Sequence, residues 1–264
     1  MPRITTVIFD MYETLVQNPH GTGKSSFAKI IEQQGLDTTV DELWDHWLPA
    51  EEAFQISRVD PELPFQSYFS AWKGGFELSF SDLKLVGDSQ AATEQFFRDV
   101  SQRAPYPETD DAVAEVQKRW RTAILSNADD GFLLPNLELL QVGFDTVLTS
   151  EQAKVYKPRP ELFQMMLAQL GVAPEETAYV GDRQLEDVMG AVQAGMHPVW
   201  INRNNKPADP DLPAPSHQIS SLLELPKLLA NRSEEHTSEL QSRRNLVCRL
   251  LLEKKKKKST TPTE

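Results

Sequence analysis

The chain has 264 residues, 39% of them hydrophobic, which is enough for one large domain or a domain with a sizeable insertion. No apolar run approaches the ~20 residues needed to cross a bilayer. The first ten residues, MPRITTVIFD, show no secretory pattern, because their apolar stretch is short and leads directly into an acidic motif. We therefore expect a cytoplasmic protein with no membrane partner.

The segment 232–264 differs in composition from the rest of the chain. It begins RSEEHTSELQSRRNLVCRLLLEKKKKK, which resembles the conceptual translation of a sequencing adapter that runs into a poly-A stretch. A block of five lysines is also typical of a disordered charged tail. We expect 232–264 to be adapter-derived and unstructured, and we exclude it from the fold predictions.

Without this tail, the remaining chain is more acidic and contains no cysteine. The tail holds nine Lys and Arg residues and five Asp and Glu residues, so residues 1–231 hold 18 basic and 34 acidic groups, a net charge of −16. Such a surface repels nucleic acid and anionic membranes. The only cysteine, Cys248, lies in the tail, which excludes disulfides, cysteine catalysis and cysteine-based zinc sites from residues 1–231. The remaining histidines show no metal spacing and give no support to a zinc or Ser–His hydrolase: His20, His46, His197 and His217.

Short β-branched and aromatic runs alternate with helical patterns along much of the chain. Strands are predicted at 4–9, 122–127, 144–150, 177–182 and 197–202. Helices are predicted at 110–120, 161–170, 185–195 and 219–230, with an exposed connecting loop at 202–217. This alternation predicts an α/β fold, a doubly wound, Rossmann-like parallel sheet with right-handed crossovers.

The first two strands are separated by a long segment with helical periodicity. Helical patterns appear at 26–35, 40–54, 66–78 and 92–103. Aromatic residues recur there at three- and four-residue spacing and are expected to form buried core: Trp44, Trp47, Phe65, Tyr68, Phe69 and Trp72. We therefore predict a core of residues 1–15 and 107–231 and an inserted helical cap of residues 16–106.

Polar residues follow four of the predicted strands, where an open parallel sheet has its ligand crevice. They are Asp10, then Ser126 and Asn127, then Ser150 and Glu151, and finally Gly181 and Asp182. Lys157 follows the third of these strands, and Asp187 lies near the start of a predicted helix. The topology therefore predicts that these side chains converge on one crevice.

Four segments resemble, in order and spacing, the motifs of the haloacid dehalogenase (HAD) superfamily of hydrolases, in the subfamily with a helical cap inserted after the first motif. They are FDMYETLV (9–16), ILSNAD (124–129), VYKPRPELF (155–163) and VGDRQLEDVMGA (180–191). The resemblance covers residues 1 to 231. It implies that Asp10 is a nucleophile, that Ser126 and Lys157 hold the transferring group, and that Asp182 and Asp187 form the acidic metal motif.

Charge indicates a role for a cation at such a site. A phosphoryl group carries roughly two negative charges at neutral pH, and Asp10, Asp182 and Asp187 would add three more. Mg²⁺, a hard ion that binds carboxylate and substrate oxygens, would relieve that repulsion. The alternative is that Asp182 and Asp187 only cap the following helix.

One position departs from the phosphatases of this superfamily. These enzymes usually have a second aspartate two residues after the nucleophile, where this chain has Tyr12, and Glu13 replaces the usual glycine. The missing carboxyl normally protonates the leaving oxygen and then activates water, and positioned acid–base groups contribute ~10²–10⁴-fold. A tyrosine, with a pKa near ~10, is a poor base at neutral pH. An Asp-x-Tyr motif is instead similar to the haloacid dehalogenases themselves, whose departing halide needs no proton.

The acidic pair in GDRQLED decides between these interpretations, because it has little use in halide displacement. We expect a Mg²⁺-dependent phosphatase that acts on a small phosphorylated metabolite through an aspartyl-phosphate. Its catalytic residues would be Asp10, Tyr12, Ser126, Asn127 and Lys157, with Asp10, Asp182 and Asp187 holding the metal. The alternatives are a metal-independent 2-haloacid dehalogenase with an Asp-ester intermediate, and a catalytically weak binding protein on the same fold.

Two further expectations concern ligands and partners. The segment HGTGKSS (20–26) is predicted to be a loop and a helix start, because Asn18 stands where a phosphate-binding loop needs its first glycine. The expected partner is a small-molecule substrate, bound by a monomer or homodimer with no nucleic acid. Trp44, Trp47 and Arg58 are cap residues that could line its pocket.

Overall fold

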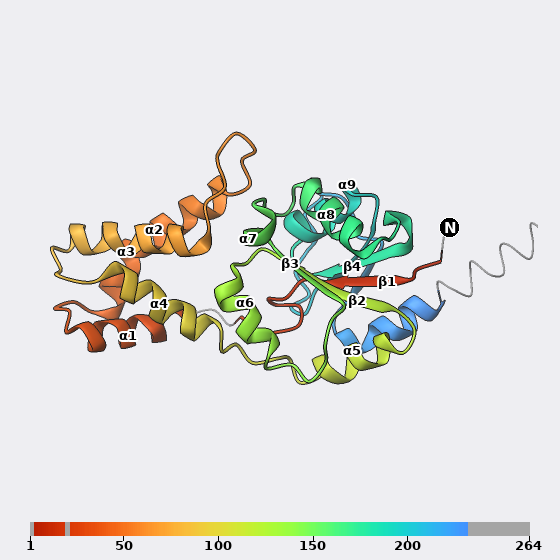
Figure 1. Ribbon diagram of the computed structural model, residues 1–264, viewed down its shortest axis with the longest axis horizontal. Helices are drawn as coiled ribbons and strands as arrows, with labels where there is room; N and C mark the ends of the chain where they lie inside the picture. Colours follow the sequence, from red (N-terminus) through yellow and green to blue (C-terminus); the bar gives the residue numbers. More distant parts are fainter. Residues whose placement is uncertain (1–2, 19–21, 232–264) are drawn as a thin grey trace, which may run out of the picture.

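The computed structural model describes residues 3–18 and 22–231. Figure 1 shows two lobes: a helical lobe formed by α1 to α4, and a larger lobe built around a twisted sheet. The predicted tail 232–264 and residues 20 and 21 of the HGTGKSS segment lie outside the described residues. Among the helices that are described, none combines the length and the apolar character needed to cross a bilayer.

The larger lobe contains a six-stranded parallel sheet in the order β3-β2-β1-β4-β5-β6. The strands are β1 (Thr6–Phe9), β2 (Arg121–Ser126), β3 (Thr146–Thr149), β4 (Thr177–Gly181), β5 (His197–Ile201) and β6 (His217–Ile219). The five predicted strands are present, and the doubly wound parallel sheet is confirmed. The sixth strand was not predicted, because three residues at the end of a Pro-rich loop give too short a pattern.

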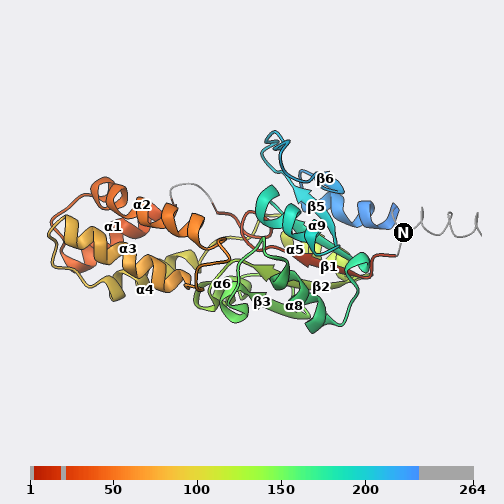
Figure 2. The same ribbon diagram turned by 90° about the horizontal axis from the view of Figure 1, so that it is seen from above.

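Helices cover both faces of the sheet (Figures 1 and 2). Alternate residues of a strand point to opposite faces. Ile8 therefore packs with Phe163 of α8, whereas Val7 packs in a cluster with Val113 of α5 and Leu229 near the chain's described end. The helical elements of this lobe are α5 (Thr109–Gln117), α6 (Asp130–Leu137), α7 (Ser150–Ala153), α8 (Pro160–Leu170), η1 (Pro174–Glu176), η2 (Gln184–Met189), α9 (Gly190–Gln193) and η3 (Leu222–Glu224). A final helix covers residues 225–231, so it begins later than predicted.

The helical lobe is a bundle packed around aromatic side chains, as the spacing predicted. It comprises α1 (Thr22–Gln34), α2 (Val40–Ser57), α3 (Tyr68–Asp82) and α4 (Ser89–Val100). Trp47 lies at its centre, against Phe27, Phe76 and Phe96 at centroid distances of 5.4, 5.8 and 5.4 Å. Its indole N–H donates to the carbonyl of Trp72 at 3.4 Å, so the one polar group of the ring is satisfied.

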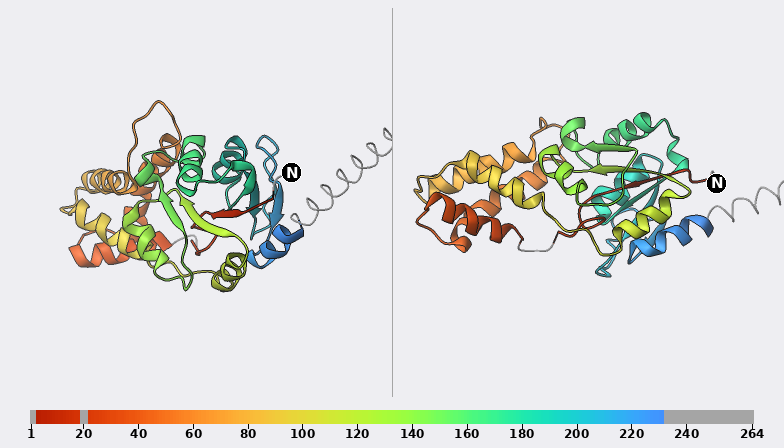
Figure 3. Two further views of the ribbon diagram at one scale, coloured as in Figure 1. Left: turned by 45° about the vertical axis from the view of Figure 1, so that its right-hand side comes forward. Right: turned by 60° about the horizontal axis from the view of Figure 1, so that its bottom comes forward.

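Two connections join the lobes, and they run side by side (Figure 3). Val16 on the outgoing connection forms an antiparallel bridge with Pro105 on the returning one. Gln17 reinforces this pairing, because its backbone N–H donates to the carbonyl of Ala104 at 2.9 Å. The helical lobe is therefore attached through one narrow, paired neck.

Close packing also accounts for a glycine of the HGTGKSS segment. Gly23 lies in the first turn of α1, where an added Cβ would lie 2.3 Å from the ring of Trp44. The glycine thus permits the close approach of α1 and α2. The described part of the segment forms the start of a helix, as predicted.

Truncating Trp47 tests the aromatic bundle. We expect Trp47→Ala to lower the free energy of unfolding by about 3–5 kcal/mol, because the side chain is only 2% exposed and its loss leaves a large cavity. Urea unfolding followed by circular dichroism measures this change. The matched control is Ile56→Ala in the same helix, where the side chain is 74% exposed and a change within about 0.5 kcal/mol is expected.

Candidate active site

The sheet brings the predicted site residues to its carboxyl edge. β1 lies between β2 and β4, and the strand order reverses direction there, which is where open α/β sheets bind ligands. Asp10 directly follows β1, and its backbone N–H donates to the carbonyl of Val180 on β4 at 2.8 Å. Ser126 ends β2 and donates its hydroxyl to Asp10 Oδ1 at 2.8 Å.

The Lys157 ammonium joins the separate segments. Its Nζ donates to Asp10 Oδ1 at 2.7 Å, to Asp187 Oδ1 at 2.6 Å and to the hydroxyl of Tyr179 at 2.9 Å. Burial alone would lower the pKa of Lys157, but the carboxylates of Asp10 and Asp187 raise it well above its usual value. The lysine is therefore protonated at neutral pH.

Three carboxylates gather around this lysine. One oxygen from each of Asp10, Asp182 and Asp187 lies within 4.8 Å of the others. Burial and repulsion from its neighbours raise the pKa of Asp182 well above its usual value. Burial likewise raises the pKa of Asp187 to about 6, although Lys157 opposes the shift. Oxygen ligands that repel one another in this way fit a hard divalent cation such as Mg²⁺.

The sequence left open the alternative that Asp182 and Asp187 only cap the following helix, and Asp187 does so in part. Its Oδ2 accepts the backbone N–H of Arg183 at 2.8 Å, at the start of the π-helical turn η2. Its other oxygen faces Lys157. No helix-capping hydrogen bond is found for the Asp182 side chain among the described residues. Of these two residues, therefore, only Asp187 acts as a cap, and only through its Oδ2.

Asn127 holds the loop that carries Lys157. Its Oδ1 accepts the backbone N–H of Lys157 at 2.7 Å, and its Nδ2 donates to the Lys157 carbonyl at 3.1 Å. The same Nδ2 donates to Glu186 Oε2 at 3.3 Å. Asn127 is thus placed to fix the position of the lysine through its backbone.

The hydroxyl of Tyr12 is bound by a residue outside the carboxylate cluster. Its hydroxyl accepts a hydrogen bond from Asn136 of α6 at 3.1 Å, and its ring packs against Phe132 and below the guanidinium of Arg103. Burial raises the pKa of Tyr12 far above its usual value. No hydrogen bond connects Tyr12 with Asp10 within the described part of the chain. Tyr12 therefore stays a neutral, structural neighbour of the site in this geometry.

Glu13 occupies a backbone conformation that favours glycine. Its φ of 58° lies in the left-handed region, which explains why glycine is usual at this position. The side chain is held in place, since its Oε1 accepts the N–H of Asn18 at 2.5 Å and its Oε2 accepts the hydroxyl of Tyr106 at 3.0 Å. These contacts offset the backbone cost.

The residues that follow β3 do not reach the carboxylates. Ser150 Oγ accepts the N–H of Ala128 at 3.0 Å and donates to its carbonyl at 3.1 Å. Glu151 accepts the N–H of Asp130 at the start of α6 at 2.8 Å. Both residues shape the loop after β2 that presents Ser126 and Asn127.

Two buried polar residues of the site, Tyr179 and Glu186, were not predicted from the sequence. Tyr179 donates to the Leu125 carbonyl at 2.9 Å while accepting from Lys157. Glu186 pairs with Arg58 of the helical lobe at 2.7 Å and with Arg183 at 2.8 Å. A tyrosine in an otherwise apolar strand was a usable signal, because a buried hydroxyl needs a partner. Nothing in the sequence paired Glu186 with a residue of another lobe.

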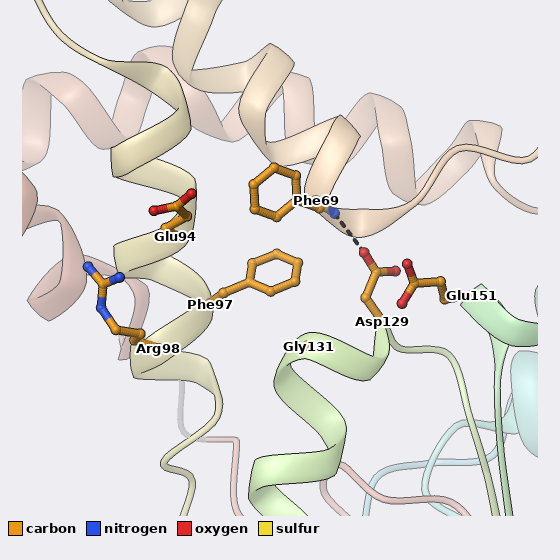
Figure 4. Close-up of a pocket in the computed structure, with 7 residues that line it drawn as sticks. All are labelled: Phe69, Glu94, Phe97, Arg98, Asp129, Gly131 and Glu151. Atoms are coloured by element: carbon orange, nitrogen blue, oxygen red, sulfur yellow. Dashed lines mark hydrogen bonds between the residues drawn. The ribbon is translucent and has the colours of Figure 1, made fainter.

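Asp129 fastens the helical lobe to the core close to this site. Its two oxygens accept the backbone N–H groups of Tyr68 at 3.0 Å and Phe69 at 2.8 Å, at the start of α3. Figure 4 shows the second of these bonds at the rim of a cleft between the lobes. Trp44 and Trp47 instead pack inside the helical lobe, and of the three suggested cap residues only Arg58 contacts the site region.

Substituting Gly181 tests how closely Asp187 is packed beside Lys157. An added Cβ would lie 2.3 Å from Asp187 Cγ, so we expect Gly181→Ala to displace the Asp187 carboxylate from Lys157 and to cost about 1–3 kcal/mol of stability. A crystal structure and urea unfolding of the variant measure both effects. Gly74→Ala is the control, since nothing lies within 4 Å of its added methyl and α3 should gain rather than lose stability. An undisplaced Asp187 would contradict the packing argument.

Comparisons with known proteins identify the family to which this chain is similar. Residues 4–195 match the family of haloacid dehalogenase-like hydrolases. The phosphoserine phosphatase of Thermus thermophilus is 36% identical over 170 residues, which cover 59% of this chain and 66% of that protein. The (S)-2-haloacid dehalogenase 1 of a Pseudomonas species is 38% identical over 110 residues, which cover 41% of this chain and 48% of that protein. The matches thus span less than two thirds of either relative.

The fold agrees with the family match. The solved structure of the L-2-haloacid dehalogenase from Xanthobacter autotrophicus superposes with a TM-score of 0.68 at 20% identity, over 86% of this chain and 98% of that one. At this identity the likeness concerns the fold. Since the family match spans most of the sequence and the sheet, inserted helices and motif order agree with it, the chain belongs to the haloacid dehalogenase-like hydrolases.

Proposed function

We propose that this hydrolase is a Mg²⁺-dependent phosphatase of a small phosphorylated metabolite, with Asp10 as its nucleophile. The observation that carries the proposal is the gathering of Asp10, Asp182 and Asp187 within 4.8 Å, beside one lysine. Three carboxylates exceed the charge of a single ammonium, and an incoming phosphoryl group adds further negative charge. Alkyl halide displacement would have no use for this acidic group.

The residues divide the work by charge and position. Ser126 and Lys157 both bind Oδ1 of Asp10, which leaves Oδ2 as the attacking oxygen. This oxygen forms a bond to phosphorus while the bond to the leaving oxygen breaks, giving an aspartyl-phosphate. Water then attacks phosphorus, releases phosphate and restores the Asp10 carboxylate. Bound to Asp10, Asp182 and Asp187, Mg²⁺ would neutralise phosphoryl charge.

The position of Tyr12 narrows the expected substrates. Its hydroxyl is bound to Asn136 and its pKa is raised by burial, so it is unsuited to protonating the leaving oxygen or activating water. The leaving group would depart without a proton from this side chain. We therefore expect preference for phosphates with good leaving groups.

The second candidate function is metal-independent 2-haloacid dehalogenation, and Tyr12 favours it. A halide leaves without a proton, so the neutral tyrosine two residues after Asp10 is no handicap there. In that reaction Asp10 would form an ester with the substrate carbon and expel the halide. A catalytically weak binding protein is the third candidate, supported only by Tyr12 and Glu13.

Two assays separate these functions. We expect phosphate release from p-nitrophenyl phosphate that needs Mg²⁺, stops in EDTA, and falls about 10³-fold or more in Asp10→Asn, which removes the nucleophile. Asp45→Asn is the matched control, because this carboxylate is exposed on α2 of the helical lobe. Chloride release from 2-chloropropionate that persists in EDTA, without phosphatase activity, would instead establish the dehalogenase. Ligand binding without turnover of either substrate would support the third candidate.

The pKa of Asp187 predicts how Mg²⁺ binding varies with pH. Burial raises this pKa to about 6, so the carboxyl is largely protonated at pH 5.5 and must lose its proton to bind a cation. The folded, metal-free protein binds this proton more tightly than the unfolded chain, and its contribution to stability is lost as pH rises through 6. Mg²⁺ should therefore raise the Tm more at pH 7.5 than at pH 5.5. Thermal unfolding at both pH values measures this, and Asp187→Asn should abolish the difference.

A further inference from the structure

The side chain of Arg203 lies beside the loop that follows the nucleophile. Arg203 comes two residues after β5, and its side chain is only 13% exposed. Its Nε donates to the carbonyl of Glu13 at 3.3 Å, and one terminal nitrogen donates to the carbonyl of Thr14 at 2.8 Å. The other terminal nitrogen donates to Oε1 of Glu108, the residue before α5, at 2.5 Å. One guanidinium therefore joins the end of β5, the loop after Asp10 and the start of α5.

Tyr106, on the connection that returns from the helical lobe, contacts the same guanidinium and the same loop. The guanidinium carbon of Arg203 lies 3.5 Å from the ring centre of Tyr106. The hydroxyl of Tyr106 donates to Glu13 Oε2 at 3.0 Å, and its backbone N–H donates to the carbonyl of Leu15 at 3.0 Å. A guanidinium stacks well on an aromatic ring while its donors keep fixed directions. Arg203 and Tyr106 therefore hold the loop after the nucleophile together.

This loop is a tight turn that begins directly at Asp10. The carbonyl of Met11 accepts the N–H groups of Leu15 and Val16 at 2.9 and 3.0 Å, and the N–H of Glu13 donates to the carbonyl of Val16 at 2.8 Å. Glu13 has a φ of 58° in this turn, a conformation that is costly for a residue with a side chain and readily adopted by glycine. The turn therefore depends on contacts from outside it to keep this shape.

We propose that Arg203 is a positioning residue for the nucleophile. Its two carbonyl contacts keep Glu13 in the conformation that glycine would adopt unaided, and so fix the backbone that carries Asp10. The inference rests on the proposed role of Asp10, which attacks in both the phosphatase and the dehalogenase candidates. Within the described part of the chain, Arg203 makes no hydrogen bond or ion pair with Asp10, Asp182 or Asp187. It therefore acts through the loop and not on the substrate.

Arg203→Lys tests this role with the smallest risk to folding. Lysine keeps the positive charge opposite Glu108 but lacks the planar fork that reaches both carbonyls. We expect kcat to fall about tenfold or more while KM changes by less than about twofold, because a displaced nucleophile slows the chemical step without removing a substrate contact. The assay uses whichever of p-nitrophenyl phosphate and 2-chloropropionate the wild-type protein converts.

Arg121→Lys is the matched control. Arg121 also binds one carboxylate and one carbonyl, those of Asp145 at 3.1 Å and Leu170 at 2.9 Å. It lies at the start of β2, at the opposite edge of the sheet from Asp10. The same substitution there should leave kcat within about twofold of the wild-type value.

Glu13→Gly separates a positioning role from a purely structural one. Glycine adopts the left-handed conformation without help, so in the Glu13→Gly background the loss of kcat caused by Arg203→Lys should shrink to about threefold or less. An arginine that only stabilises the fold would lower the Tm in both backgrounds and leave kcat unchanged well below the Tm, which would overturn the inference. A loss of kcat of equal size in both backgrounds would overturn it as well.

Crystal structures of the variants decide the inference even if the wild-type protein converts neither substrate. We expect residue 13 to leave the left-handed region in Arg203→Lys, with Asp10 displaced from Ser126 and Lys157, and to keep the wild-type conformation in the double variant. An unchanged loop, or a displaced loop with Asp10 still bound to both partners, would overturn the assignment and leave the proposed phosphatase function untouched. A wild-type protein that converts only 2-chloropropionate would refute the phosphatase, while the same structures would still decide the role of Arg203.

Discussion

The shared ammonium of Lys157 is the contact on which the site depends. It binds carboxylates from two distant motifs, Asp10 after β1 and Asp187 in η2, and takes the hydroxyl of Tyr179 as a third partner. Buried charges of one sign cannot remain together without compensation, so this lysine sets the distance between the strands' polar ends. Asn127 binds the backbone of Lys157 and the side chain of Glu186, so it connects the loop that carries the lysine with the turn η2 that carries Asp187. The two lobes then meet where Arg58 reaches Glu186.

Much of this arrangement could be predicted from the sequence because it follows from backbone topology. Asp10, Ser126 and Asp182 lie at or directly after strand ends, so they must converge if the sheet is parallel and doubly wound. Periodicity likewise predicted α1 to α4 and their aromatic interior. Strand β6 could not be predicted, because its three residues are too few to show a periodic pattern. The π-helical form of η2 could not be predicted either, because it depends on the local packing of Asp187 against Gly181.

Side-chain partners were the less predictable part. The Tyr12 position indicates a missing acid, yet only the structure shows that its hydroxyl faces Asn136. The Arg58–Glu186 contact joins residues 128 positions apart, and no pattern in either segment refers to the other. Contacts between two lobes depend on how the lobes dock, which a local sequence pattern does not encode. The cleft between the lobes in Figure 4 likewise depends on how the lobes dock.

The paired neck at Val16 and Pro105 gives the fold a modular character. Everything between these residues leaves and re-enters the core at one point, where the two chain segments already lie one bridge apart. An evolving gene can therefore lengthen, exchange or delete the helical insert while the strand order of the sheet stays intact. The carboxylate cluster and Lys157 belong to the larger lobe, so such an exchange would leave them in place, whereas Arg58 would leave with the insert.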